Sequence, residues 1–283
     1  MNLIVGAIIV WAAVIAGYTL SGGQLLALWQ PFEVLTICGA AFGAFFISNP
    51  MSVVSTTIKS SFGLLGGTPY NKTLYMELLS CLYDVFQKIR KEGLIAIEGD
   101  IDDPKSSAIF SKYKLITKDH HVMDFICDYL RLMVVGDMAA HELEALMDAE
   151  LETHHSEALL PSTALAKVEN GLPGFGIVAA VMGIVITMGS LGGPPEVLGH
   201  HVGAALVGTF LGILLAYGFV GPMSTQMEHR VREEGKFYEC IKVSLLACVS
   251  GAPPQIAVEF GRKVLYSTVR PSFTELEKRV RGG

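Results

Sequence analysis

One short segment has the spacing of a nucleotide-binding loop. Gly174, Gly176 and Ala179 fit the pattern G-x-G-x-x-A, and Glu196 follows about twenty residues later, as in a dinucleotide fingerprint. That chemistry requires a strand before the loop, so that the backbone can approach a pyrophosphate at a helix N-terminus. No strand pattern precedes Gly174, and the segment lies in a stretch without Asp, Glu, Lys or Arg. We therefore interpret these small residues as helix-packing positions.

The histidines and cysteines lack the spacing of a metal centre. The histidine pairs are His120–His121, His154–His155 and His200–His201, and the five cysteines are Cys38, Cys81, Cys127, Cys240 and Cys248. None of the pairs has ligand spacing within a helical turn, and no C-x-x-C pair occurs. No Ser/His/Asp or Cys/His arrangement stands out either. The sequence predicts no metal site, no disulfide, no cofactor and no enzyme activity.

The elements that must position any functional residue are long and apolar. The chain has 283 residues, 51% of them apolar and 17% charged, with a mean hydropathy of +0.46. Such values are typical of a membrane protein. The net charge of -6 argues against nucleic acid as a partner, because no basic surplus exists to neutralise phosphates.

The placement of charge predicts four membrane spans. Glu33 is the only acidic or basic residue in 1–58, and none occurs in 171–195 or 197–227. Each stretch can cross about 30 Å of hydrocarbon at about 1.5 Å per residue. The first stretch divides at the polar segment 21–31. The predicted helices are 3–20, 33–49, 172–191 and 201–221, joined in two pairs by short loops.

The basic residues predict the orientation. All 21 lysines and arginines fall in 59–167 and 230–281, and the two short loops contain none. By the positive-inside rule, the middle segment, the C-terminal tail and both termini are cytoplasmic.

The expected fold is an all-α membrane protein. Spans one and two occupy 1–50, a cytoplasmic helical domain 51–170, spans three and four 171–222, and C-terminal cytoplasmic helices 223–283. Apolar residues at helical spacing support helices outside the spans, and amphipathic residues predict that spans three and four continue as helices beyond the membrane. Turns are expected at Gly93, Asp100–Pro104 and Gly251–Pro254.

The span interiors are predicted to hold no ionisable group of their own. A carrier of protons inside a membrane normally needs one. If the chain conducts ions, the titrating carboxylate must therefore come from another polypeptide.

Small and hydroxyl residues mark spans three and four. Ala204, Gly208, Gly212 and Ala216 form a stripe that allows close helix contact, either within the chain or with a partner. Thr187 and Thr209 place hydroxyls at apolar depth, where each could bond a carbonyl of its own helix or face a wet path.

Two prolines lie near the ends of these spans. Pro173 and Pro222 either start and stop helices, because proline lacks a backbone donor, or act as hinges.

Several runs of sequence resemble one family. The run LPGFGIVAAVMGIVITMGSLGGPPE, followed by HHVGAALVGTFLGILLAYGFVGPMST, is similar to the flagellar stator A subunit family. The runs KIRKEGLIAIEGDIDDP, LMDAELETHH and APPQIAVEFGRKVLYSTVRPSFTELE also resemble it. The resemblance implies a ring of five in the bacterial inner membrane, surrounded by lipid, around two single-span B subunits. Those partners would supply a proton-binding aspartate and a peptidoglycan anchor, and proton flow would turn the ring against the rotor's switch protein.

The resemblance also implies roles for individual residues. Arg90 and Glu98, with Glu150 as a weaker third, match the charges that engage the rotor. Pro173 and Pro222 match the prolines that couple ion passage to movement, while Thr209 matches a pore-facing threonine. Ala180 stands where sodium-driven relatives typically carry a hydroxyl. A sodium ion needs several oxygen ligands, so the proton is favoured as the transported ion.

Three alternatives stay open at this point. The nearest is a proton-channel subunit of the ExbB/TolQ-type energy transducers, which typically have three spans and an external N-terminus. A secondary transporter would usually carry intramembrane polar residues and inverted repeats, neither of which is evident. A structural scaffold could share the small-residue stripes without conducting ions.

Overall fold

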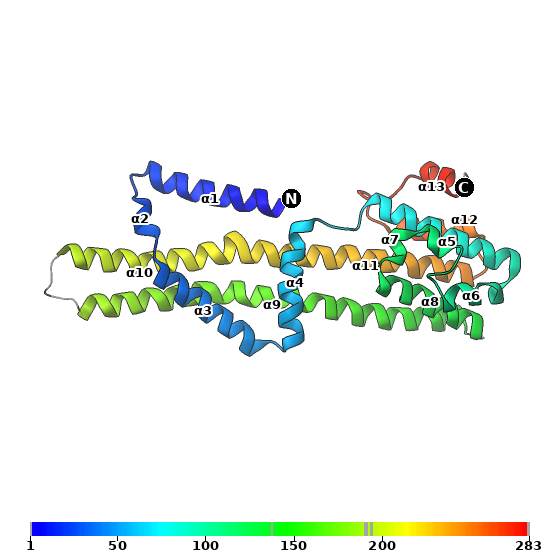
Figure 1. Cartoon of the computed structure of the whole chain (residues 1–283), viewed down its shortest axis with the longest axis horizontal. Helices are drawn as coiled ribbons and strands as arrows, with labels where there is room; N and C mark the ends of the chain where they lie inside the picture. Colours follow the sequence, from blue (N-terminus) through cyan, green and yellow to red (C-terminus); the bar gives the residue numbers. More distant parts are fainter. Residues whose placement is uncertain (1, 137, 190–191, 193–194, 282–283) are drawn as a thin grey trace. The chain divides into compact units, whose positions relative to one another are not determined.

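The structure, a computed structural model, describes residues 2–136, 138–189, 192 and 195–281 (Figure 1). In these ranges the chain is helical and contains no strand, which confirms the all-α prediction. The chain forms two compact units. The first comprises Met1–Gly67 and Ala158–Arg230, and the second comprises Thr68–Glu157 and Val231–Gly283.

The first unit contains the apolar helices. These are α1 (Asn2–Leu20), α2 (Leu25–Leu28), α3 (Pro31–Ser48), α4 (Met51–Gly63), the 3-10 turn η1 (Leu64–Gly66), part of α9 (Ala140–Gly189), α10 (Pro195–Leu215), the π-helix η4 (Ala216–Val220) and the start of α11 (Gly221–Val249). Four helical segments of the described chain are long and apolar enough to cross a membrane. This confirms the four predicted spans.

The third and fourth spans belong to long helices, as predicted. Helix α9 runs for 50 residues, and α10, η4 and α11 follow one another without a break (Figure 1). The predicted end of span three at Ser190 and Leu191 lies outside the described residues. The second span begins at Pro31, two residues earlier than expected, because proline is preorganised for the first turn of a helix.

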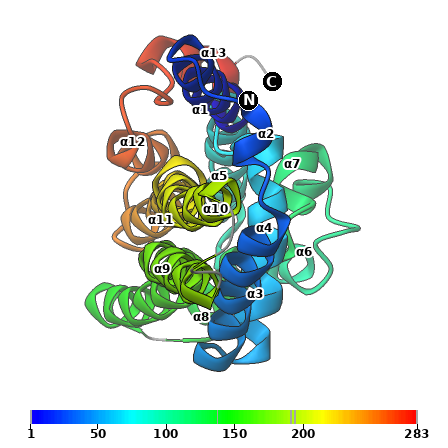
Figure 2. The ribbon, with the colours of Figure 1, turned by 90° about the vertical axis from the view of Figure 1, so that its left-hand side faces the viewer.

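Helices α3, α9 and α10 form the core of the first unit and lie side by side in Figure 2. Their shared buried residues are Ile37, Ala41, Leu172, Ala179, Val207, Leu211 and Ala216. A smaller cluster joins α3, α4 and α9 through Phe45, Val53, Val54 and Ala164. Most other apolar side chains of these helices are exposed, as expected for surfaces that face lipid.

Neither of the two singled-out prolines starts or stops a helix. Pro173 lies inside α9, and Pro222 is the second residue of α11, directly after the π-helix η4. Pro222 has no N–H to bond the carbonyl of Gly218, so the regular α-helical ladder cannot close there. A local π-turn is one way in which a continuous helix accommodates such a defect.

The second unit contains shorter, amphipathic helices. These are α5 (Lys72–Glu92), η2 (Leu94–Ile97), α6 (Glu98–Asp102), η3 (Phe110–Lys112), α7 (Lys114–Thr117), α8 (His120–Val135), the first part of α9, most of α11, α12 (Pro254–Val264) and α13 (Phe273–Arg281). One large core joins them. Its bulkiest fully buried side chains are Tyr75, Phe86, Phe110, Tyr129 and Phe237.

Local signals set the ends of these helices. The side chain of Asn71 accepts a hydrogen bond from the Leu74 N–H at 3.0 Å and caps α5. Gly93 ends α5 with a φ of 90°, a conformation that favours glycine. The turn expected from Asp100 begins later than predicted, because α6 continues to Asp102.

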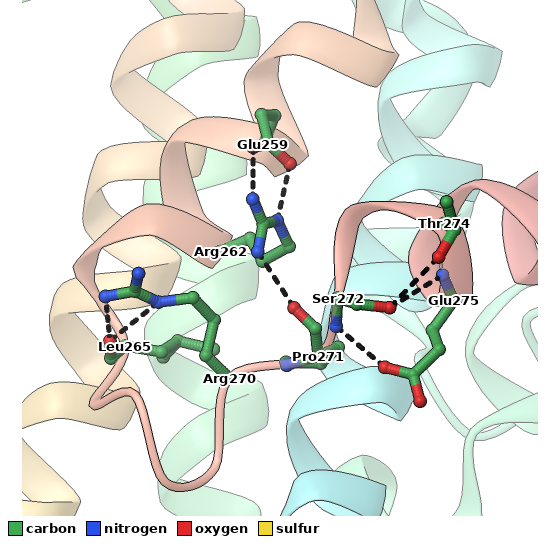
Figure 3. Close-up of polar contacts among 8 residues, drawn as sticks. All are labelled: Glu259, Arg262, Leu265, Arg270, Pro271, Ser272, Thr274 and Glu275. Atoms are coloured by element: carbon green, nitrogen blue, oxygen red, sulfur yellow. Dashed lines mark hydrogen bonds and ion pairs between the residues drawn. The ribbon is translucent and has the colours of Figure 1, made fainter.

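An arginine stabilises the return of the chain after α12 (Figure 3). The buried guanidinium of Arg262 donates two hydrogen bonds of 2.6 Å to Glu259, and a third of 2.8 Å to the Pro271 carbonyl. Arg270 donates to the carbonyl of Leu265. This planar, bidentate geometry is specific to arginine.

The last helix starts with a capping box (Figure 3). The Glu275 N–H donates to the Ser272 hydroxyl, and the Ser272 N–H donates to the Glu275 carboxylate at 2.7 Å. Two backbone donors at the helix start are thereby satisfied. The Lys72 ammonium lies 2.8 Å from the same carboxylate and lowers the pKa of Glu275 to about 2.

Candidate functional site

The closest contact in the first unit joins α9 and α10 at glycine. A Cβ atom added to Gly212 would lie 2.8 Å from the Leu172 carbonyl oxygen and 2.9 Å from the Gly176 Cα. A Cβ added to Gly176 would lie 3.0 Å from the Gly208 carbonyl oxygen. The two backbones can approach this closely only because neither helix carries a side chain there.

The small-residue stripe takes part in this contact over most of its length. Gly208 and Gly212 face α9, and Ala216 is fully buried. Beyond Gly208, the residue that touches Gly183 is Ala205, whereas Ala204 is half-buried and has no described contact with it.

The two threonines of these spans differ in hydrogen bonding. Thr187 is buried, and its hydroxyl donates to the Gly183 carbonyl at 2.7 Å, within its own helix. The Thr209 hydroxyl has no hydrogen bond within the described part of the chain, and it lies beside the glycine contact. Ala180 reaches the same contact, since its backbone nitrogen lies 3.4 Å from a Cβ placed on Gly208. Thr209 and Ala180 therefore both border the α9–α10 glycine contact, Thr209 beside Gly176 and Ala180 beside Gly208, whereas the Thr187 hydroxyl bonds within its own helix.

One acidic residue comes close to this contact and was missed as a site residue. Glu33 lies in the first turn of α3, and one of its carboxylate oxygens lies 3.0 Å from a Cβ placed on Gly208. Glu33 lies at the N-terminal end of α3, and the expectation that the span interiors hold no acidic residue stays a prediction. The signal was present in the sequence, because Glu33 is the only charge in 1–58.

A second acidic residue, Glu169, lies near both prolines, close to Pro173 through its backbone and close to Pro222 through its side chain. The backbone carbonyl of Glu169 loses its helical donor because Pro173 stands four residues later. The Glu169 carboxylate packs against Gly221, directly before Pro222. Pro173 and Pro222 were predicted together, but this connection through Glu169 depends on the packing of α9 against the fourth span.

The second unit presents Arg90 and Glu98 at one exposed bend. Arg90 lies in the last turn of α5, and Glu98 begins α6, with Gly93 and η2 between them. Both side chains are exposed, and neither has a hydrogen bond or ion pair within the described residues. The buried Ile97 and Ile101 fix this segment to the core.

The Asp100 carboxylate links the start of α6 to α5 and to the loop that follows α6. Its carboxylate accepts hydrogen bonds from Lys88 of α5 at 2.7 Å and from the Ser107 hydroxyl at 2.6 Å. From the sequence, Asp100 was expected only as a turn residue. Its pairing with Lys88, twelve residues earlier, follows from the chain reversal at Gly93.

Glu150 is engaged within the chain. Its carboxylate accepts a 2.5 Å hydrogen bond from the Tyr129 hydroxyl, although the Glu150 side chain is otherwise exposed. Burial, followed by this hydrogen bond to Glu150, raises the pKa of Tyr129. Glu150 thus differs from Arg90 and Glu98, which have no hydrogen-bond or ion-pair partner among the described residues.

A further carboxylate of the second unit is half-buried. Glu234 of α11 lies 3.6 Å from the Nε2 atom of His154 in α9. Burial raises the pKa of Glu234, while His154 and His121 lower it and Asp119 adds to the increase. The ring of Tyr238 packs on His154 with 4.8 Å between centroids.

The other candidate chemistry has little support in the described structure. Gly174–Ala179 lies inside α9 and follows a helix rather than a strand, and the side chain of Glu196 lies outside the described residues. Among the described side chains, no group of three His, Cys, Asp or Glu could hold a metal ion. All five cysteines are free thiols.

Two family models match the chain. The model described as "Motility protein A N-terminal" matches residues 4–93, and that described as "MotA/TolQ/ExbB proton channel family" matches residues 118–239. Solved structures of similar fold include one titled "Structure of C. jejuni MotAB", with a TM-score of 0.78, 18% identity and coverage of 96% of this chain and 98% of that chain. The flagellar MotAB stator complex from Bacillus subtilis gives a TM-score of 0.74 at 23% identity, covering 97% of each chain.

Sequence relatives cover nearly the whole chain. Motility protein A of Escherichia coli is 47% identical over 281 residues, which is 99% of this chain and 95% of the relative. The chemotaxis protein LafT of Vibrio parahaemolyticus is 39% identical over 278 residues, 98% of each. With its four spans, the chain is a multi-pass membrane protein that belongs to the motility protein A family, within the MotA/TolQ/ExbB proton channel proteins.

Proposed function

We propose that the chain is the A subunit of a flagellar motor stator, which converts proton flow into torque on the rotor. The observation that carries this proposal is the near full-length similarity to Motility protein A. The titles of the similar structures support a MotB-type partner for those proteins, and we extend that partnership to this chain. The ring of five and the two B subunits remain part of the proposal.

The proposed ion path requires that partner. Spans three and four offer the Thr209 hydroxyl, which has no hydrogen bond among the described residues, beside a tight glycine contact, with Glu33 at the edge. The single-span B subunit would contribute the titrating aspartate. Movement of one charge down the membrane potential yields about 2.3 kcal/mol per 100 mV. That energy can shift the proposed ring of A subunits from one packing arrangement to another, without any enzyme chemistry in this chain.

We propose the proton as the transported ion. Ala180 borders the α9–α10 contact at Gly208 and contributes no side-chain oxygen, whereas a sodium ion needs several oxygen ligands to replace its water. In liposomes that hold this chain with its B-type partner, we expect proton flux in sodium-free buffer, and none from the chain alone. Robust flux from the lone chain would contradict the proposal, and a strict sodium requirement would contradict the choice of ion.

The second unit is proposed to face the cytoplasm, with both chain termini, because all basic residues fall outside the short loops. Arg90 and Glu98 would then contact the rotor's switch protein as unpaired opposite charges. The engagement of Glu150 by Tyr129 fits its weaker expected role.

Charge reversal tests this rotor contact. We expect Arg90→Glu and Glu98→Lys to abolish swimming while leaving protein levels unchanged, because both side chains are exposed and unpaired. Lys263→Glu, at an exposed site on α12, is the matched control and should swim normally. Swimming speed of a complemented deletion strain and membrane immunoblots provide the measurement. Normal swimming of both reversal variants would refute the contact.

The energy transducers of the ExbB/TolQ type share the broader of the two family models. The relatives named above favour the stator, since they are called motility and chemotaxis proteins. Restored motility of the deletion strain by this chain would separate the two functions.

A further inference from the structure

Helix α4 lies across the direction of the membrane spans. It begins three residues after α3 ends, and in Figure 1 it runs across α9 and α10. Its buried Val53 and Val54 pack with Phe45 of α3 and Ala164 of α9. Ala164 lies seven residues before the charge-free stretch 171–195. A helix that crosses the span direction close to the end of a charge-free stretch lies in the membrane interface, parallel to the bilayer surface.

The two exposed edges of α4 differ in polarity. Met51, Ile58 and Phe62 recur at helical spacing along one edge, and all three are exposed. The opposite edge carries Thr56 and Lys59, which are also exposed. An interfacial helix is divided in this way, because its apolar edge lies in hydrocarbon and its polar edge lies among the lipid headgroups.

Two cations lie along the polar edge. Gly63 follows Lys59 by one helical turn, and a Cβ atom added to Gly63 would lie 3.7 Å from an Nη atom of Arg230. Arg230 donates hydrogen bonds to the backbone carbonyls of Leu64 and Gly67, which are neutral acceptors. Lys59 has no hydrogen bond or ion pair among the described residues. Basic side chains at a membrane surface attract anionic headgroups.

An apolar groove opens at the apolar edge of α4. Its cavity has a volume of about 280 Å³, and Ile58 contributes to its wall. The groove follows α3 from Phe45 back to Cys38, and α9 from Leu165 on to Leu172. Seven residues of helix cover about 10 Å. The groove therefore extends from the interface into the hydrocarbon region, along the direction in which lipid chains lie.

The lining of the groove suits a hydrocarbon chain. Its two hydroxyl groups belong to Thr57 and Ser61, and they donate to carbonyls of α4 itself at 2.7 and 2.8 Å. The cavity is larger than the apolar cavity of about 150 Å³ that accepts benzene in another protein. An empty space of this kind forfeits dispersion contacts. Since the groove opens toward lipid, an acyl chain is the filler at hand.

We propose that α4 and this groove bind an anionic phospholipid, with its phosphate near Lys59 and Arg230 and one acyl chain in the groove. A phospholipid is favoured over a protein partner because an apolar trough beside a basic helix edge matches its two chemically different ends. Lys59 directly follows Ile58, and its long side chain lets the ammonium reach the headgroup of a chain that enters beside Ile58. The inference depends on the chain being a membrane protein and goes beyond the proposed stator function.

A photoreactive lipid tests the site. The full-length chain, with any subunits that accompany it on purification, is placed in phosphatidylcholine nanodiscs containing a little phosphatidylglycerol with a diazirine in its acyl chain. Mass spectrometry of peptides then locates the label. We expect labelling of Phe42 and Ile58, which line the groove, to exceed that of Ile184, an exposed residue of α9, severalfold. A phosphatidylcholine probe with the same acyl chain should not show this enrichment.

Variants separate the headgroup contact from the groove. Lys59→Gln should lower labelling of Phe42 by the anionic probe about fivefold, the effect of one basic residue near an anionic surface. Lys167→Gln is the matched control, because Lys167 is exposed on α9 but does not share the helical face of Leu165. Cys38→Phe should fill the groove and reduce labelling of Phe42, whereas Cys38→Ala should preserve it.

Two results would overturn the inference. If Phe42 and Ile58 stay unlabelled while Ile184 is labelled, another protein, such as a second copy of this chain, covers the groove. If both probes label the groove equally and Lys59→Gln has no effect, the groove holds bulk lipid without preference for an anionic headgroup. Neither result bears on the stator function, which the flux and swimming measurements test separately.

Discussion

The two units of the chain are stabilised by different kinds of packing. In the first unit, the central contact joins backbones at Gly176, Gly208 and Gly212, and most bulky apolar side chains are exposed. In the second, bulky side chains such as Phe86 and Phe237 are fully buried. The difference follows from the solvent, because lipid is as apolar as leucine and rewards close backbone contact, whereas water rewards burial of large apolar side chains.

The largest effect is expected from the aromatic core of the second unit. Phe86→Ala removes a fully buried ring from α5 and should lower the free energy of unfolding by about 3–5 kcal/mol. Phe260→Ala, at a 53% exposed site on α12, should change it by less than about 0.5 kcal/mol. Chemical denaturation of the detergent-solubilised chain, followed by circular dichroism, measures both. Equal losses would mean that side-chain burial does not distinguish these sites.

A smaller effect is expected from an added methyl group in the first unit. Gly212→Ala places a Cβ 2.8 Å from the Leu172 carbonyl oxygen, so α9 and α10 must separate. Overpacking of this kind typically destabilises by about 1–3 kcal/mol. Gly203→Ala is the control, because no atom lies within 4 Å of its added Cβ. The melting temperature in detergent is the readout, and an unchanged value for Gly212→Ala would contradict the close contact.

The smallest effect at neutral pH is expected at the half-buried carboxylate of Glu234. Glu234→Gln removes both the burial penalty of the ionised group and its interaction with His154, and these oppose each other. The pKa of Glu234 is raised in the folded chain, so the folded state binds more protons and its stability falls as pH rises from 4.5 through the raised pKa.

The pH dependence therefore carries the prediction for Glu234. Relative to wild type, the stability of Glu234→Gln should improve as pH rises from 4.5 through the raised pKa of Glu234. The width of this pH window also depends on the charges of His121, His154 and Asp119. Denaturation midpoints at a series of pH values provide the test, and Glu157→Gln, at an exposed site on α9, is the control. A parallel pH profile for wild type and Glu234→Gln would show that Glu234 titrates normally.

The spans could be located from the sequence because a charged side chain is costly to place in lipid. The stretches 171–195 and 197–227 contain no charge, and the structure places long helices there. Helical spacing also indicated α5 and α8. Their exposed ends were less predictable, as Val135 has the spacing of the core face but is 80% exposed.

The sequence by itself determined the helical spans and their small-residue stripe, because each depends on residue type and local spacing. Arg90 and Glu98 were predicted only through the family resemblance. Only the tertiary structure decided which of these residues meet. It paired Tyr129 with Glu150, placed Glu33 against Gly208, and linked Glu169 to Gly221. Such contacts join residues far apart in the chain, and their geometry depends on how whole helices pack, which no local pattern specifies.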